Sequence, residues 1–259
     1  MRLGPYEFRP RLLPALVTLA LLPALLALGF WQLDRAEQKR ALLAQWEAGK
    51  RAAPSALSEL GATGSKDADT RFRRVRAKGQ YDQAHQFLLD NQIREGRAGF
   101  QVLTPLRLAG REKAVLINRG WVPMGASRRD LPDLPAPEGE QQLRGILTDP
   151  PSVGIRLGEA DTGGNDWPKV VQYVAPERIQ KQLGYPVMER VIQLGRNQPH
   201  GFERDWEAPV HFGPQRHVGY AVQWFGLAAA LLAIFLVVNT KRSKPAHAES
   251  IHERFHADS

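Results

Sequence analysis

Apolar residues are concentrated in two long runs of this chain, residues 12–33 and residues 218–238. The first run has only Thr18 and Gln32 as polar side chains, and the second has no charged residue. At a helical rise of about 1.5 Å per residue, each run is long enough to cross the roughly 30 Å apolar core of a bilayer. The pattern therefore predicts two transmembrane helices.

The first run has an alternative interpretation as a cleaved signal peptide. A small-x-small site at residues 27–29 and three preceding arginines would fit one: Arg2, Arg9 and Arg11. The apolar stretch of a signal peptide normally has about 7–15 residues, however, and this run is longer. We therefore expect the first span to be retained.

These runs divide the chain into five parts, of which only the central one can fold by itself. We expect a cytoplasmic N-terminal tail (1–11), a transmembrane helix (12–33), an extracytoplasmic domain (34–217), a second transmembrane helix (218–238) and a cytoplasmic C-terminal tail (239–259). The basic residues Lys241, Arg242 and Lys244 favour the cytoplasm for the C-terminal tail, and long loops translocate regardless of their charge. An N-terminal tail of 11 residues leaves no room for a mitochondrial transit peptide, so we expect a bacterial inner-membrane protein.

The central domain has the pattern of a mostly-β fold. Alternating and β-branched runs predict strands at 72–81, 85–89, 100–108, 114–122, 142–148, 170–174 and 187–194. Helix formers predict a continuation of the first span over 34–50 and a short helix over 176–183. Turn residues between the early strands indicate antiparallel hairpins. The fold class is therefore a membrane protein in which two transmembrane α-helices flank one mostly-β (α+β) extracytoplasmic domain.

Charge and composition narrow the possible functions. The chain contains no cysteine, which excludes disulfide scaffolds, thiol catalysis and cysteine-ligated metal sites. Its formal net charge is +8, and most of the excess lies in the central domain, outside the cytoplasm, where a nucleic-acid partner is disfavoured. The densest basic stretch, residues 71–78, could face anionic lipid head groups or an acidic partner, or could be a solvated strand with charges on both faces.

No motif gives positive support for an enzyme. The chain has no glycine-rich phosphate loop and no G-x-S-x-G elbow. Residues 252–256 match H-E-x-x-H, but a zinc site would need a third ligand, supporting contacts and a cleft that a short tail does not supply. Acidic residues that could pair in space show no informative spacing: Asp82, Asp90, Asp130 and Asp133.

The most informative residues flank the membrane. His217, Tyr220 and Trp224 are spaced i, i+3 and i+7, so they share one helix face at the start of the second span. A neutral imidazole is a good axial ligand for haem iron, and neighbouring aromatic rings could stack on the macrocycle. The alternative is an ordinary interfacial histidine within an aromatic belt. If the two spans pack together, Trp31 and Gln32 would lie near the level of His217.

Four blocks carry a resemblance to a known family. They are Gly-Phe-Trp-Gln-Leu at 29–33, followed by Arg35 and Lys39; Gly-Phe-Gln-Val-Leu-Thr-Pro-Leu at 99–106; Ile-Asn-Arg-Gly-Trp-Val-Pro at 117–123; and His217 with Tyr-Ala-Val-Gln-Trp-Phe at 220–225. In these blocks and in its two-span layout the chain resembles the Surfeit locus protein 1 (Shy-type) family of cytochrome oxidase assembly factors.

The resemblance implies a non-enzymatic membrane assembly factor that binds haem a transiently and assists its insertion into the catalytic subunit of a haem-copper oxidase. It implies that His217 is the axial ligand, near Tyr220, Trp224, Trp31 and Gln32. It also implies contact with that subunit, with the haem a synthesis machinery and with membrane lipid. A cofactor-free scaffold for an assembly intermediate is the alternative.

The role of residues 118–123 stays open between packing and contact with a partner. A partner role would fall on Arg119 and Trp121, because arginine and tryptophan are the residue types enriched in interface hot spots. A packing role fits a strand that ends at a turn, where Gly120 permits close backbone approach and Pro123 stops the ladder.

Overall fold

The computed structural model describes residues 2–3, 6–60, 70–126, 130–151, 166–208, 210 and 212–242. The chain forms two compact units. One consists of residues 1–42 together with 210–259, and the other of residues 43–209. The second unit is shorter than the expected domain because residues 34–42 remain part of a long helix, as the helix formers in that stretch predict.

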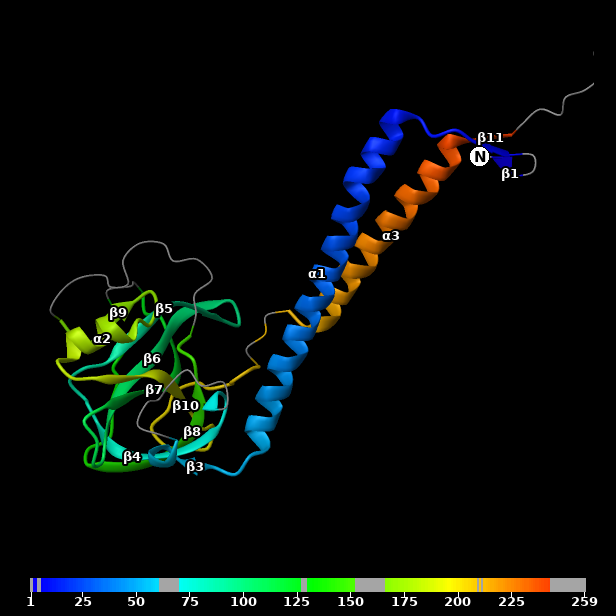
Figure 1. Cartoon of the computed structure of the whole chain (residues 1–259). Helices are drawn as coiled ribbons and strands as arrows, with labels where there is room; N and C mark the ends of the chain where they lie inside the picture. Colours follow the sequence, from blue (N-terminus) through cyan, green and yellow to red (C-terminus); the bar gives the residue numbers. More distant parts are fainter. Residues whose placement is uncertain are drawn as a thin grey trace, which may run out of the picture. The chain divides into compact units, whose positions relative to one another are not determined.

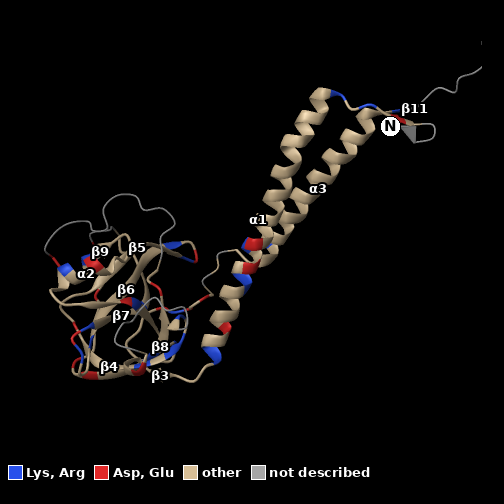
Figure 2. Cartoon of the chain, in the orientation of Figure 1, with Lys and Arg blue, Asp and Glu red and all other residues tan. Residues whose placement is uncertain are grey.

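Two helices are long and apolar enough to cross a membrane, as the sequence predicts. They are α1 (Leu12–Arg51) and α3 (Pro214–Asn239), and they flank the mostly-β unit in the chain. In Figure 2, charged residues are absent from α3 beyond its first turns and from the N-terminal half of α1, and they begin partway along α1. The chain is therefore built as a membrane protein with two spans and a β domain.

The two helices pack antiparallel through small side chains. Gln32 of α1 contacts His217 near the start of α3, while the backbone N–H of Arg11 donates to Asn239 Oδ1 at the end of α3. The less exposed positions of α1 recur at alternating steps of four and three residues, 18, 22, 25, 29, 32 and 36. That spacing is the seam of a left-handed helix pair. Gly29, Ala36, Ala221 and Ala228 are buried on the two seams.

A small sheet joins the two chain ends, which the sequence pattern does not predict. It contains β1 (Arg2–Leu3), β2 (Tyr6–Phe8) and β11 (Thr240–Arg242), all antiparallel. Asn239 supports the junction, because its side chain is almost fully buried and also donates to the carbonyl of Phe235. The ends of both helices are therefore tied together by backbone hydrogen bonds.

The second unit is built around a closed five-stranded barrel (Figure 1). Its strands are β4 (Arg74–Tyr81), β6 (Arg97–Leu108), β7 (Ala114–Pro123), β10 (Val187–Leu194) and β8 (Glu140–Thr148), in this order around the ring, and β8 pairs with β4 to close it. All neighbours are antiparallel except β7 and β10, which run parallel. The five strands enclose a core of apolar side chains that includes Val75, Leu106, Ile117, Leu143 and Ile192.

Shorter elements extend this barrel. β5 (Phe87–Arg94) pairs with β6, β9 (Lys169–Val171) pairs with β5, and β3 (Ser55–Ala56) pairs with β4. The 3-10 turn η1 (Leu57–Glu59) follows β3, and α2 (Pro176–Leu183) precedes β10. Ile179 and Leu183 bury one face of α2 on a second core cluster, which also contains Phe87 and Leu116.

The expected antiparallel hairpins are confirmed for β5 with β6 and for β6 with β7, but not for the first pair of strands. The sequence predicts that consecutive strands pair, but β4 does not pair with β5. It pairs instead with the C-terminal part of β6, at Gly79, Gln80 and Tyr81, and with β8. A strand of 12 residues such as β6 can serve two partners, β5 along its first half and β4 along its second, and this arrangement closes the barrel.

Candidate functional site

His217 and Gln32 meet across the helix pair. The distance between His217 Nδ1 and Gln32 Oε1 is 2.8 Å, and both side chains are half-buried. An amide oxygen only accepts, so Nδ1 must be the donor and the neutral imidazole carries its proton there. The other ring nitrogen, Nε2, then keeps its lone pair. Among the residues that the structure describes, Nε2 has no hydrogen-bond partner.

A second contact between the two helices lies three residues from Gln32 on α1 and eight residues from His217 on α3. A Cβ atom on Gly29 would lie 2.5 Å from the Phe225 ring, so glycine is needed for the observed approach. The ring of Phe225 also packs edge-on against Phe30, with 5.3 Å between centroids. The contact between Gln32 and His217 is therefore held by packed neighbours.

The predicted aromatic residues lie at different depths around His217. Trp224 is half-buried, whereas Trp31 and Tyr220 are 51% and 41% exposed. The guanidinium of Arg35 lies 5.9 Å from the Trp31 ring centroid. Of the predicted set, the structure joins Gln32 directly to His217 and leaves Trp31 and Tyr220 on the outer surface of the helix pair.

The single imidazole of this site could ligate a metal ion whose other ligands come from a cofactor. Within the described part of the chain, no group of three or more His, Asp or Glu side chains could hold a bare metal ion. A porphyrin supplies four nitrogens, so a single imidazole suffices as an axial ligand. A fixed Nδ1 donor and a free Nε2 are what ligation through Nε2 requires.

The two other family-like blocks also meet in space. Residues 99–106 lie in β6 and residues 117–123 lie in β7, and the two strands pair antiparallel from Gly99 opposite Pro123 to Thr104 opposite Ile117. A Cβ atom on Gly99 would lie 2.4 Å from the Trp121 ring, so this glycine makes room for the indole. Trp121 is only 4% exposed, and its Nε1 donates to the carbonyl of Gln92 at 2.8 Å.

Arg119 is 1% exposed and lies inside a network of neutral acceptors. Its Nε and Nη2 donate to the carbonyl of His200 at 2.8 and 2.7 Å, and Nη2 donates to the carbonyl of Pro135 at 2.5 Å. Nη1 donates to Gln86 Oε1 and Thr104 Oγ1 at 3.3 and 3.4 Å. The geometry of Arg119 and Trp121 therefore fits the packing alternative, because neither offers an exposed surface.

Burial shifts the titration of this network. Burial lowers the pKa of Arg119, and the nearby phenol of Tyr81 acts in the opposite direction. Burial likewise raises the pKa of Tyr81 to about 12, although Arg119 and Arg204 lower it. Arg119 stacks against Phe202 at 4.8 Å from the ring centroid. Sequence reasoning missed the partners Gln86, Thr104 and His200, because they are scattered along the chain and no motif links them.

A second polar cluster forms around Asp82, which the sequence singles out only as an acidic residue. Tyr185 donates to its Oδ2 at 2.6 Å, and His85 Nδ1 lies 2.9 Å from both carboxylate oxygens. Burial raises the pKa of Asp82, but the hydrogen bonds from Tyr185 and His85 together hold it below its ordinary value. The H-E-x-x-H pattern at 252–256 lies outside the described residues.

Comparison with known proteins matches most of the chain to a single family. A family model described as the SURF1 family matches residues 19–229. A SURF1-like protein of Rickettsia felis is 25% identical over 236 residues, covering 86% of this chain and 95% of the relative. A Surfeit locus protein 1 of Takifugu rubripes is 24% identical over 256 residues, covering 87% and 97%. A SURF1-like protein of Monosiga brevicollis is 25% identical over 83% of both chains.

Proposed function

The chain belongs to the SURF1 family, and on that basis we propose that it is an assembly factor that holds haem a through His217 and assists its insertion into the catalytic subunit of a haem-copper oxidase. The contact between His217 Nδ1 and Gln32 Oε1 carries this proposal. It joins two of the four family-like blocks, and it fixes the imidazole so that Nε2 is available for iron.

The surroundings of His217 support a flat, largely apolar ligand. Trp31, near the end of the first apolar run, and Tyr220, near the start of the second, expose large rings on the same helix pair. Tryptophan and tyrosine at such positions combine an apolar ring with a polar edge, as haem itself combines an apolar macrocycle with polar propionates. When bound, the haem supplies the iron that an imidazole ligates.

The proposed function needs no covalent bond of the haem to be made or broken; only a coordination bond between the iron and His217 would form and break. A transient carrier releases its cargo when the acceptor's own ligands bind the iron more tightly than one imidazole does. His217 and Gln32 then have two tasks, to orient Nε2 and to hold the ring in one tautomer. We propose the haem a synthesis machinery as the donor and the oxidase subunit as the acceptor.

We place the protein in the bacterial inner membrane with both termini in the cytoplasm and the barrel in the periplasm. Lys241 and Arg242 directly follow α3 and support this orientation under the positive-inside rule. The sheet of β1, β2 and β11 supports it further, because it requires both chain ends to lie on one side of the membrane.

The experiment that tests this function compares oxidase made in cells whose only copy of the chain is wild type or His217→Ala. The proposal expects His217→Ala to yield oxidase with less than about a third of the haem a per catalytic subunit, at a normal level of the variant chain. His200→Asn is the matched control, because it removes an exposed imidazole at a positive φ that asparagine tolerates. Normal haem content with His217→Ala would favour the cofactor-free scaffold.

A further inference from the structure

The basic stretch of β4 is one-sided in the folded barrel. Along β4 the exposed and buried positions alternate, with Arg74, Arg76 and Lys78 exposed and Val75 and Ala77 buried. The side chains of a strand alternate between faces, so the three cations share the outer face of the barrel. The alternative of charges spread over both faces therefore does not apply to β4.

The neighbouring strand β8 neutralises one of these cations and adds another. In the pairing of β4 with β8, Arg76 stands directly opposite Arg144. Like charges at such positions destabilise a sheet. Lys78 has a partner in Glu140 at 2.7 Å. Among the described residues, however, Arg74, Arg76 and Arg144 form no ion pair, so this part of the sheet retains uncompensated positive charge.

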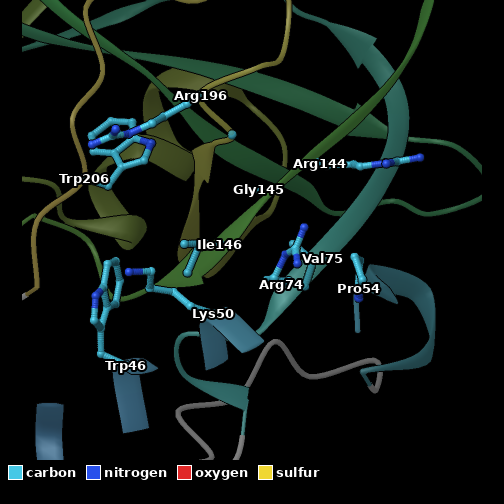
Figure 3. A pocket seen from close by; sticks show the side chains of 11 residues that line it. Trp46, Lys50, Pro54, Arg74, Val75, Arg144, Gly145, Ile146, Arg196 and Trp206 are labelled. Atoms are coloured by element: carbon cyan, nitrogen blue, oxygen red, sulfur yellow. The ribbon is translucent and has the colours of Figure 1, made fainter. Parts of the chain in front are cut away.

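Two hollows lie along the same pair of strands, and cations line both of them. Three of these cations have ion-pair partners beside the hollows: Lys50 pairs with Glu47, Lys78 with Glu140 and Arg196 with Asp205. The first has a volume of about 430 Å³ and is lined by Lys50, Arg74, Arg144 and Arg196 together with Trp46 and Trp206 (Figure 3). The second has a volume of about 340 Å³, and its cations are Arg76, Lys78 and Arg111. We call these seven cations the basic face.

The two tryptophans act as walls of the first hollow. Trp46 is buried against Phe72, with 5.2 Å between ring centroids. Trp206 donates its Nε1 hydrogen to the carbonyl of Leu194 at 2.7 Å. Indoles held in this way do not insert into a lipid interface, which argues against a membrane surface as the occupant and for a ligand that enters the hollow.

The spacing of the cations indicates the shape of that ligand. Arg74, Arg76 and Lys78 are two residues apart along β4, which is about 6.6 Å per step. An extended peptide presents every second side chain on one side at the same period. Guanidinium groups bind carboxylates through paired hydrogen bonds, and indole walls can accept an apolar side chain.

From this geometry we propose that the basic face binds an extended acidic segment of a partner protein, with carboxylates at alternate positions and an apolar side chain in the hollow that Trp46 and Trp206 help to line. This inference rests on the proposed function only because an assembly factor must bind the protein that it helps to assemble. The surface itself is separate from His217.

The test uses the full chain in detergent and a fluorescein-labelled peptide of about twelve residues, with glutamate at alternate positions and one phenylalanine. Binding is measured by fluorescence anisotropy at about 0.05 M and 0.15 M salt, without haem. A second peptide of the same composition places all glutamates consecutively. The variants are Arg74→Glu with Arg144→Glu, the milder Arg76→Gln, and the matched control Arg178→Glu, which reverses an exposed charge on α2.

We expect the alternating peptide to bind more tightly than the consecutive one and to lose affinity as salt rises. The double reversal should weaken binding at least about tenfold, Arg76→Gln by about two- to fivefold, and Arg178→Glu by less than about twofold. Equal binding of both peptides, or equal losses in the double reversal and the control, would overturn the proposal. Binding to phosphatidylglycerol vesicles without binding to the peptide would overturn it in favour of lipid. Because no haem is present, these outcomes are independent of the His217 experiment.

Discussion

Arg119 holds its guanidinium in the interior of the domain without any carboxylate partner among its hydrogen bonds. Its donors instead satisfy two backbone carbonyls and two side chains that come from distant parts of the chain. A buried charge that is fully hydrogen-bonded fixes the geometry of the groups around it, because its loss would take this donor from the carbonyls of Pro135 and His200. Arg119 therefore ties β7 to the loops that contain Pro135 and His200.

We predict that Arg119→Lys destabilises the domain by about 3 kcal/mol, because lysine lacks the planar fork that reaches both carbonyls at once. Chemical unfolding of the full chain in detergent, followed by tryptophan fluorescence, would measure the loss. The control Arg178→Lys on exposed α2 should change stability by less than about 0.5 kcal/mol. Equal unfolding midpoints for both variants would contradict this account of Arg119.

The cluster around Asp82 predicts a pH-dependent contribution to stability. Burial raises the pKa of Asp82, but the hydrogen bonds from Tyr185 and His85 and the nearby guanidinium of Arg107 together keep it below its ordinary value of 3.8 in the folded state. A lowered pKa gives stability that is fully present above the unfolded pKa and is lost as pH falls through the folded pKa.

Tyr185→Phe removes the hydrogen bond to Asp82 and should cost about 1–2 kcal/mol at pH 7. The difference between wild type and variant should then narrow as pH falls from about 5 to about 3, since protonation of Asp82 removes the charge that Tyr185 stabilises. Unfolding free energies of wild type and Tyr185→Phe, measured across this pH range, would test the predicted narrowing. A difference that stays constant with pH would show that Tyr185 acts by packing alone.

The sequence predicts the neighbour of His217 but not the partners of Arg119. His217 and Gln32 are polar side chains at the edges of the two apolar runs, so packing of the two spans is enough to predict that they lie near each other. The sequence singles out Arg119 only because it lies in the family-like block at residues 117–123, and nothing in that block predicts that its side chain is buried. Its acceptors are mainly backbone carbonyls, which every residue has and no sequence pattern marks.

The helix pair depends on a small residue where a ring of α3 packs on the backbone of α1. The Phe225 ring lies against Gly29, whereas Gly226 on α3 has open space around it. In lipid there is little hydrophobic gain from pairing helices, so close packing at small residues supplies much of the association. The two glycines therefore give a matched pair of positions for the same substitution.

Gly29→Val should loosen the helix pair by about 1–3 kcal/mol, because the added side chain overlaps the Phe225 ring. Amide hydrogen exchange of α1 and α3 in detergent would report this as faster exchange. Gly226→Val should exchange like wild type, and Phe225→Ala should restore slow exchange in the Gly29→Val chain. Equal exchange in the two valine variants would show that the helices do not pair through Gly29.

Most elements could be predicted, and most strand partners could not. The ranges of α2 and β10 agree with the sequence prediction because proline begins α2, glycine follows its end, and β10 contains the β-branched residues Val187, Val191 and Ile192. The closure of the barrel depends on β6 serving both β4 and β5, and on β10 lying parallel to β7. These are long-range pairings that local periodicity does not encode.

At the scale of the whole molecule, one chain combines two apolar helices with a basic β domain, and its ends meet in a small sheet. The apolar runs indicated this division directly, because length and hydropathy are enough to recognise a span. The sheet between the chain ends was not foreseeable from strands of two or three residues.

The absence of cysteine makes the proposed orientation testable with single engineered thiols. Tyr6→Cys places a thiol at the exposed side chain of β2, and Lys181→Cys places one on exposed α2. A membrane-impermeant maleimide added to intact cells should label position 181 and leave position 6 unlabelled until the inner membrane is permeabilised. Labelling of position 6 in intact cells would reverse the topology.

The measurement that tests the central claim most directly is the visible absorption spectrum of the full chain, purified in detergent after co-expression with a haem a synthesis pathway. Our account predicts a haem band in wild type that is lost in His217→Ala and kept in the control His200→Asn. Haem retained equally in all three would contradict His217 as the ligand, and no haem in any folded chain would contradict the carrier function itself.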